Sequence, residues 1–284
     1  MTDKYAVIGN PIAHSKSPEI HTMFAAQFKD KPAGDISYEK IEAPLDGFAV
    51  TVERLRKEGY KGCNVTVPFK FDACRIVNEV SNEVIDAFDS GESPDAINTL
   101  DFRNGAITGY NTDGIGLLRD ITQNLKHEIT GKRVLLMGAG GAAYGVLHPL
   151  LEASPASFVI YNRTLEKALI LKKSTEQHDK FRHVSLNAVE FGKLGNAQFD
   201  IVINATSVGL TDSKIPLPET VFALGALAYD MMYGRDTPFM KFAREHGAQV
   251  ADGLGMLVEQ AAEAFWIWRG VRPDTASVIA ALRG

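Results

Sequence analysis

Cysteine is scarce in this sequence. Cys63 and Cys74 are the two cysteines in 284 residues. Small secreted domains that depend on a disulfide framework carry many more, so this class is excluded. Both cysteines stand among apolar residues, where a reduced core thiol is the usual state. The fold must therefore rest on a hydrophobic core, which a chain of this length can build, most simply as two domains.

Long apolar runs and blocks of positive charge are missing as well. The least polar window, 134–151, is interrupted by glycines, His148 and Pro149, and it suits a strand, a turn and a helix better than a membrane span. The N-terminus does not have the pattern of a signal peptide. The formal net charge is −5 and the pI ≈ 5.8, so neither nucleic acid nor a membrane is an expected partner. We predict a cytoplasmic monomer or homodimer that binds small molecules.

Strands and helices alternate along the chain. In the first half we predict strands at 5–9 and 36–41, helices at 17–28 and 47–57, and a hairpin at 97–110. In the second half we predict strands at 133–137, 157–161, 182–185, 199–203, 226–230 and 249–252, followed by a helix at 256–269. Repeated βα units favour parallel sheets, so the fold class is α/β.

A glycine-rich turn joins the strand at 133–137 to an Ala- and Leu-rich helix. Gly138, Ala139, Gly140, Gly141 and Ala142 form this turn, and together with Ala143 they have the spacing G-x-G-x-x-A. The first glycine permits a sharp turn, the second lets the backbone approach a pyrophosphate closely, and the helix N-terminus favours an anion. The segment taken alone is equally compatible with an ordinary glycine turn in an α/β protein.

The strand at 157–161 ends in Asn162, Arg163 and Thr164, with Lys167 shortly after. Chains that bind NAD usually place an acid here for the ribose hydroxyls, whereas a guanidinium can hold a ribose 2′-phosphate through paired hydrogen bonds. The sequence therefore favours NADP over NAD. The alternative is that both cations are solvated residues of a helix N-terminus, where positive charge is mildly unfavourable.

Several polar residues interrupt apolar segments of the first half. Asn64 and Thr66 share one face of a strand by the two-residue period, and Lys70 follows in the first turn of the next helix, so the three can meet one ligand. The alternative for Lys70 is a surface lysine. Ser17 stands where a helix N-cap is expected, and Asp113 is either an N-cap or a functional carboxylate. In the second half, Gln260 lies on the apolar stripe of the helix predicted at 256–269. It is either a core glutamine or a residue that contacts the substrate.

Taken together, these segments resemble the NADP-dependent biosynthetic shikimate dehydrogenases over nearly the whole chain. The motifs that carry the resemblance are G-N-P-I-A-H-S-K-S-P (9–18), N-V-T-V-P-F-K (64–70), N-T-L (98–100), Y-N-T-D-G (110–114), G-A-G-G-A (138–142), N-R-T (162–164), N-A-T-S (204–207) and G-L-G-M-L-V-E-Q-A (253–261). The resemblance implies reversible reduction of 3-dehydroshikimate to shikimate with NADP, a step of aromatic amino-acid biosynthesis.

The resemblance also implies a role for each matching residue. Lys70 and Asp113 match the catalytic pair. The residues implied to bind the substrate are Ser15 and Ser17 at its carboxylate, and Asn64, Thr66, Asn98, Tyr233 and Gln260 elsewhere. The residues implied to bind NADP are Gly138, Ala139, Gly140, Gly141, Ala142, Asn162, Arg163, Thr164, Lys167, Thr206, Ser207, Met231 and Gly253. No metal site is expected.

The implied domains are a substrate-binding α/β domain at 1–112, completed by C-terminal helices at 255–284, and a Rossmann-type doubly wound domain at 113–254. Two alternatives remain. One is a dehydrogenase of the same fold that also uses quinate, with NAD or with both cofactors. The other is a non-catalytic module that binds NADP, because a fold does not by itself establish catalysis.

Overall fold

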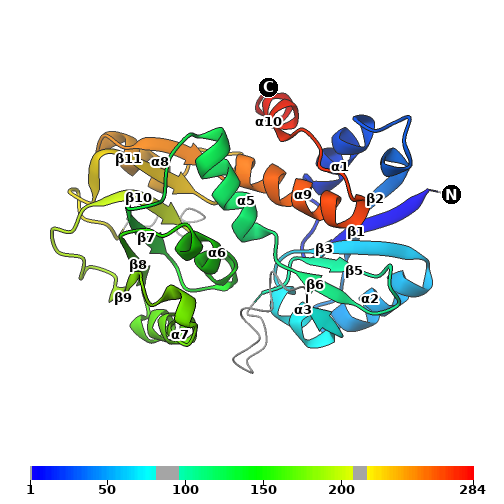
Figure 1. The fold of residues 1–284 in the computed structure, drawn as a ribbon, viewed down its shortest axis with the longest axis horizontal. Coiled ribbons are helices and arrows are strands. Elements are labelled where there is room, and N and C mark those ends of the chain that lie inside the picture. Colours follow the sequence, from blue (N-terminus) through cyan, green and yellow to red (C-terminus); the bar gives the residue numbers. More distant parts are fainter. Residues whose placement is uncertain (1, 81–95, 207–215) are drawn as a thin grey trace. The chain divides into compact units, whose positions relative to one another are not determined.

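The computed structural model describes residues 2–80, 96–206 and 216–284 (Figure 1). The chain forms two compact units. Unit 1 comprises Met1–Gly116 and Val258–Gly284, and unit 2 comprises Leu117–Leu257. The chain leaves unit 1 within helix α5 (Asp113–Arg119) and returns within α9 (Leu254–Arg269). None of the helices in the described ranges has the length and hydrophobicity of a membrane span.

Unit 1 is built on a six-stranded mixed sheet with the order β2-β1-β3-β5-β6-β4. Its strands are β1 (Asp3–Gly9), β2 (Ile36–Glu42), β3 (Tyr60–Val65), β4 (Glu79–Val80), β5 (Thr99–Asp101) and β6 (Thr108–Tyr110). Its helices are α1 (Ser17–Ala26), the 3₁₀ turn η1 (Pro32–Gly34), α2 (Phe48–Lys57), α3 (Lys70–Ile76), α9 and α10 (Thr275–Arg283). The βα units pair in parallel as predicted, and β5 is antiparallel to both β3 and β6, which gives the predicted hairpin.

Helices cover both faces of this sheet because β1 is apolar on both sides. Ala6 and Ile8 pack with residues of α2 and α3, whereas Tyr5 stacks on Trp268 of α9 at 4.6 Å between ring centroids. Helix α1 packs against α9 through Phe24 and Phe265. The returning C-terminal helix is therefore part of the core of unit 1.

Unit 2 contains a six-stranded parallel sheet with the order β12-β11-β10-β7-β8-β9. Its strands are β7 (Arg133–Met137), β8 (Ser157–Asn162), β9 (Ser185–Glu190), β10 (Phe199–Asn204), β11 (Phe222–Asp230) and β12 (Gln249–Asp252). Its helices after α5 are the π-helix η2 (Asp120–Asn124), α6 (Gly141–Glu152), α7 (Leu165–Glu176), the 3₁₀ turn η3 (Asp179–Phe181) and α8 (Pro238–Glu245). Counted along the sequence, the strand order is that of a Rossmann sheet, with the reversal between β7 and β10.

One predicted strand of unit 2 is wrong in position. A strand was predicted at 182–185, but the observed strand β9 begins at Ser185; Phe181 ends η3, and Val184 precedes β9. Both side chains are buried, so they contribute to the core without belonging to a strand. The observed strand alternates between half-buried and exposed residues over most of its length, which leaves a weaker apolar signal in the sequence.

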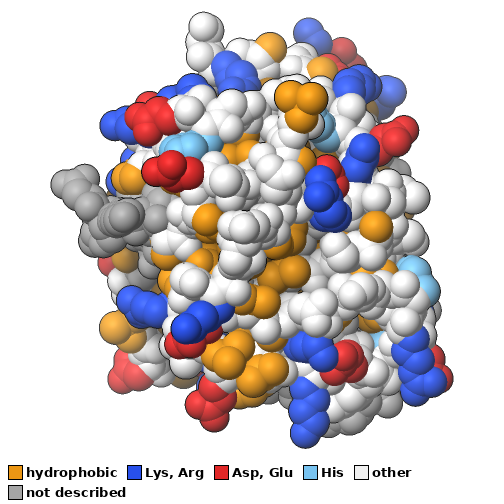
Figure 2. Space-filling model, turned by 90° about the vertical axis from the view of Figure 1, so that its left-hand side faces the viewer, with side chains coloured by type: hydrophobic (Ala, Val, Ile, Leu, Met, Phe, Trp, Pro, Cys, Tyr) orange, Lys and Arg blue, Asp and Glu red, His pale blue; other side chains and the backbone are white. Residues whose placement is uncertain are grey.

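Charge is distributed in small groups over the surface. On the face shown in Figure 2, lysine and arginine side chains lie interspersed with carboxylates. This arrangement agrees with the small net charge of the chain.

Candidate active site

Lys70 and Asp113 form an ion pair in unit 1. Lys70 is the first residue of α3, and its ammonium donates to the Oδ2 atom of Asp113, the first residue of α5. The start of α3 is held by Phe69, which is buried and stacks on Phe48. Both members of the pair are largely buried, with side chains 17% and 10% exposed. The fold thus brings two side chains that are forty-three residues apart in the sequence into direct contact.

Asn98 binds the other carboxylate oxygen of this pair. Its Nδ2 donates to Asp113 Oδ1 at 2.8 Å, and its Oδ1 accepts from the backbone N–H of Thr112 at 2.8 Å. Because a backbone N–H can only donate, the amide oxygen must face Thr112 and the amide nitrogen must face Asp113. Asp113 therefore receives a charged donor on one oxygen and a neutral donor on the other. This is the geometry of a carboxylate that orients a lysine.

Asp113 was predicted as an N-cap or a functional carboxylate, and the structure places it inside the helix. Helix α5 begins at Asp113, so the residue does not precede the helix as a cap would. Asn111 supplies the local acceptor instead, because its Oδ1 accepts from the N–H of Asp113 at 3.0 Å. The carboxylate is thereby left to Lys70 and Asn98.

Gln260 of α9 joins the same cluster. Its Oε1 accepts from Asn98 Nδ2 and from Thr112 Oγ1, each at 3.4 Å. Thr99 and Thr112 complete the polar cluster through contacts with Asn98 Oδ1. Both threonines are buried and were not among the predicted site residues. Thr99 follows Asn98 in the N-T-L segment, and Thr112 precedes Asp113 in Y-N-T-D-G. Their positions next to predicted site residues were the one feature of the sequence that could have identified them.

Asn64, near the end of β3, lies opposite Thr99 of β5 in the sheet. Its Nδ2 donates to Thr99 Oγ1 at 2.9 Å and to the backbone oxygen of Asn98 at 3.3 Å. Its Oδ1 accepts from the hydroxyl of Tyr38 at 2.6 Å. Thr66, predicted to share its strand face, lies just beyond the end of β3, and its backbone N–H donates to Ile8.

Ser15 and Ser17 lie together at the start of α1. The Ser15 hydroxyl donates to Ser17 Oγ at 3.2 Å, and Ser15 Oγ accepts from the Ser17 N–H at 3.3 Å. The predicted N-cap role of Ser17 is wrong: α1 begins at Ser17, and its N-cap residue is Lys16, whose side chain forms no cap hydrogen bond. Pro18 in the first turn already removes one donor that would need a cap.

The predicted phosphate-binding turn lies between β7 and α6 of unit 2. Gly138 has φ +113°, which disfavours any other residue, and an added Cβ would lie 3.0 Å from the backbone oxygen of Ala205. Gly140 is the N-cap of α6, so no side chain caps this helix. A Cβ on Gly140 would meet nothing within 4 Å, so the space beside this residue at the helix N-terminus is open. Open backbone donors at a helix N-terminus fit a pyrophosphate.

This turn contacts the end of the neighbouring strand β10. The N–H of Ala205 donates to the backbone oxygen of Met137 at 2.9 Å, and Thr206 donates through its hydroxyl to Asn204 Oδ1 at 2.6 Å. The two loops thus meet at the point where the strand order reverses, which is the usual ligand position in open α/β sheets. Ser207, predicted to contact the cofactor, lies outside the described residues.

Arg163 and Lys167 flank the beginning of α7. Both side chains are exposed, and neither forms an ion pair with any residue in the described part of the chain. Thr164 is the N-cap residue of α7, and the Asn162 side chain donates to the backbone oxygen of Thr164 at 2.8 Å. Two cations without a carboxylate partner at a helix N-terminus fit a phosphate group.

The remaining predicted residues of unit 2 follow β11 and β12. Gly253 approaches the chain after β11 closely, since a Cβ there would lie 2.3 Å from the backbone oxygen of Met231. Tyr233 lies in the same loop, and burial raises the pKa of its hydroxyl.

Within the described ranges, no cluster of three or more His, Cys, Asp or Glu side chains is arranged to hold a metal ion.

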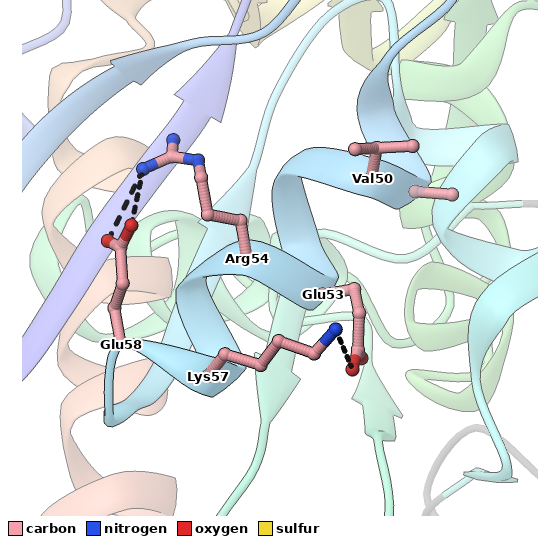
Figure 3. A pocket seen from close by; sticks show the side chains of 6 residues that line it. Val50, Glu53, Arg54, Lys57 and Glu58 are labelled. Atoms are coloured by element: carbon pink, nitrogen blue, oxygen red, sulfur yellow. Dashed lines mark hydrogen bonds and ion pairs between the residues drawn. The ribbon is translucent and has the colours of Figure 1, made fainter.

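A surface hollow of about 580 Å³ lies along α2 (Figure 3). It is lined by Ala49, Val50, Glu53, Arg54, Lys57 and Glu58. Its charged side chains pair with one another, Arg54 with Glu58 at 3.0 Å and Lys57 with Glu53 at 3.7 Å. It contains none of the predicted site residues, so we do not assign the active site to it.

Three family sequence models match this chain. The shikimate dehydrogenase substrate-binding domain matches residues 7–100, the shikimate/quinate 5-dehydrogenase domain matches 120–211, and the shikimate 5′-dehydrogenase C-terminal domain matches 253–283. The motifs at 9–18 and 64–70 lie in the first matched range, and the glycine-rich turn at 138–142 lies in the second.

Relatives match over the whole length. The shikimate dehydrogenase (NADP(+)) of Methylobacillus flagellatus is 57% identical, with 99% of each chain covered. An enzyme of solved structure from Pseudomonas putida is 47% identical, with a TM-score of 0.86 and with 99% of this chain and 98% of that chain covered. Shikimate 5-dehydrogenase from Thermus thermophilus, solved in complex with NADP(H) and shikimate, is 32% identical, with a TM-score of 0.83 and 99% of each chain covered. The chain belongs to the shikimate dehydrogenase family.

Proposed function

We propose that the polar cluster around Lys70 and Asp113 is the catalytic centre of this enzyme. The enzyme is an NADP-dependent oxidoreductase that interconverts 3-dehydroshikimate and shikimate. The observation that carries the proposal is the ion pair between these two side chains, with Asn98 bound to the second carboxylate oxygen. A lysine that is held in place and largely buried is suited to act on a reacting oxygen atom.

Reduction of the ketone needs a hydride at carbon and a proton at oxygen. When bound, NADPH supplies the hydride. In our proposal the ammonium of Lys70 faces the ketone oxygen and stabilises the negative charge that develops there. Asp113 keeps that ammonium in place and can accept a hydrogen bond from a ring hydroxyl. In our proposal the proton reaches the oxygen from this pair of side chains.

Neutral polar groups would bind the rest of the substrate. We assign its carboxylate to the hydroxyls of Ser15 and Ser17, which lie together at the start of α1. We assign the ring hydroxyls to the side chains of Asn64, Thr66, Asn98, Tyr233 and Gln260. Buried amide and hydroxyl groups discriminate strongly, because an analogue that lacks a hydroxyl leaves them without a partner.

The residues of unit 2 fit NADP. The open N-terminus of α6, with Gly138, Ala139, Gly140, Gly141 and Ala142, would hold the pyrophosphate. Asn162, Arg163, Thr164 and Lys167 would hold the ribose 2′-phosphate. Thr206, Ser207, Met231 and Gly253 would line the rest of the cofactor site. The exposed cations at α7 support a preference for NADP over NAD.

A spectrophotometric assay tests the catalytic assignment. The absorbance of NADPH is followed with shikimate and NADP for the wild-type enzyme, for Lys70→Ala and for Lys61→Ala. Lys61 is an exposed lysine of β3, so its removal serves as the matched control. We expect Lys70→Ala to lower kcat by about 10²- to 10⁴-fold with little change in substrate affinity, because the lysine acts mainly in the transition state. A kcat close to that of the control would remove Lys70 from the mechanism.

The same assay separates the alternative functions. Turnover is compared for shikimate and quinate, each with NADP and with NAD. A clear preference for quinate with NAD would overturn the assignment of substrate and cofactor. Binding of NADP without turnover of either substrate would favour the non-catalytic alternative. The monomeric or homodimeric state stays a prediction, which light scattering tests, and the cytoplasmic location stays a prediction as well.

A further inference from the structure

Tyr38 of β2 lies beside the proposed substrate residues without being one of them. Its hydroxyl donates to Asn64 Oδ1 at 2.6 Å. Its ring stacks on the imidazole of His21 at 4.2 Å between centroids, with the planes 8° apart. Burial raises the pKa of the Tyr38 hydroxyl well above its usual value, and the contact with the Ser17 side chain only partly opposes this shift. The hydroxyl therefore keeps its proton and remains a donor.

The amide of Asn64 has one orientation that satisfies its neighbours. On one side lies the backbone oxygen of Asn98, which can only accept, so Nδ2 must face it. Oδ1 therefore faces Tyr38 on the other side, and the Tyr38 hydroxyl, which could donate or accept, must donate to it. Both N–H bonds of the amide are used, by Asn98 and by Thr99 Oγ1. His21 also lies near this amide, but neither of its ring nitrogens forms a hydrogen bond. The atom left to meet a ligand is therefore the oxygen, through its second lone pair.

We propose that Tyr38 is a positioning residue, which holds the Asn64 amide so that its oxygen accepts a hydrogen bond from a substrate hydroxyl. This inference rests on the proposed function, because it requires Asn64 to contact the substrate. It also predicts the direction of that hydrogen bond: the substrate group must be the donor. A ring carbonyl at the same place would face the amide oxygen, and both groups are acceptors. The stack on His21 fixes the phenol ring, so the hydroxyl has little freedom to turn away.

The test is Tyr38→Phe, which keeps the ring and removes the hydroxyl. We expect the KM for shikimate to rise about 3- to 10-fold, the range for losing one neutral hydrogen bond, with kcat changed less than about 2-fold. The KM for NADP should stay unchanged. The control is Tyr60→Phe, on the neighbouring part of the same sheet, whose hydroxyl lies beside Glu39. The control should leave both KM values at the wild-type level.

A double-mutant cycle distinguishes positioning from a general structural effect. If Tyr38 acts through Asn64, then Tyr38→Phe in the Asn64→Ala background causes no further rise in the KM for shikimate. Loss of packing alone would lower the unfolding temperature and raise KM equally in both backgrounds. An unchanged KM in the single variant, or an equal rise in both backgrounds, overturns the inference.

A second variant decides the question if Tyr38→Phe does not fold. Thr99→Val removes the partner at the opposite end of the same amide, so we expect a similar rise in the KM for shikimate. This rise should disappear in the Asn64→Ala background, which separates it from the contact of Thr99 with Asn98. An unchanged KM in this variant would then overturn the inference. A wild-type enzyme that does not oxidise shikimate refutes the proposed function itself. Wild-type turnover together with unaffected variants refutes only the role of Tyr38.

Discussion

His21 is a histidine that the fold keeps neutral. Its side chain is fully buried on α1, and its ring packs among Tyr38, Phe24, Phe265 and Trp268. Burial lowers the pKa of its imidazole from an ordinary value of 6.5 to about 3, and the contact with Asn64 opposes this shift only weakly. Protonating His21 in the folded state would place a charge among aromatic rings, which is costly.

The lowered pKa makes the stability of unit 1 depend on pH. The unfolded chain binds a proton at His21 below about pH 6.5, whereas the folded chain does so only below about pH 3. Within this window the unfolded state binds more protons, so stability falls as the pH falls, and it levels off below the folded pKa. Each pKa unit corresponds to about 1.4 kcal/mol, so lowering the pH from about 7.5 to about 5 should cost about 2 kcal/mol from this residue alone.

The measurement is urea unfolding at about pH 7.5 and about pH 5, followed by tryptophan fluorescence. Both tryptophans of the chain, Trp266 and Trp268, lie on the part of α9 that belongs to unit 1, so the signal reports this unit. The perturbation is His21→Phe, which keeps an aromatic ring against Tyr38 and removes the titrating group. We expect the loss of stability between the two pH values to be about 2 kcal/mol smaller in the variant than in the wild type.

Other titrating groups contribute equally to both proteins and cancel in this difference. The control is His14→Gln, because His14 is the other histidine of unit 1 and is exposed. It should keep the wild-type pH dependence. If His21→Phe also loses as much stability as the wild type on acidification, then the imidazole is not the source of the effect and our reasoning about its burial is wrong.

Two further predictions concern unit 2. Arg163→Ala should raise the KM for NADP by about 10-fold or more and leave the KM for NAD unchanged, because only NADP carries the phosphate that a guanidinium would bind; equal effects on both cofactors would contradict this role. Gly138→Ala should lower the unfolding temperature and weaken NADP binding, at a cost of about 1–3 kcal/mol from the positive φ and the approach to Ala205. Gly131→Ala is its control, since Gly131 also has a positive φ but has open space around it; equal losses in the two variants would show that the contact with Ala205 contributes nothing.

The sequence predicted the sheet of unit 2 better than it predicted the ends of the elements. Strands buried on both faces, such as β7 and β10, are continuous apolar runs and could be located closely. The strand β9 was displaced because its residues are half-buried and carry no such run. Helix α1 begins at Ser17 itself, the residue predicted as its N-cap, and the Ser15 hydroxyl accepts from the N–H of Ser17.

The candidate site was predictable where a polar residue interrupts an apolar segment. Lys70 was singled out in this way, whereas the pairing of Lys70 with Asp113 was implied by the family resemblance, and the structure brings the two into contact. Thr99 and Thr112 gave no comparable signal, because threonine is common in strands and at helix starts for reasons unrelated to ligands. Tyr38 was missed because a tyrosine in a strand is ordinary, and its hydroxyl bond to Asn64 spans two strands that are not adjacent in the sheet.

The orientations of the Asn64 and Asn98 side-chain amides depend on backbone groups, whose positions cannot be deduced from a pattern of side chains. Asn98 turns its oxygen toward a backbone N–H of Thr112, and Asn64 turns its nitrogen toward the backbone oxygen of Asn98. These backbone groups are placed by the pairing of β3 with β5, in which Asn64 lies opposite Thr99, and by the entry into α5. A shift of one residue in that pairing would turn each side chain to the other face of the sheet. The register of two short strands therefore decides which atoms face the lysine–aspartate pair, and substitutions that weaken this register should impair catalysis without touching a catalytic residue.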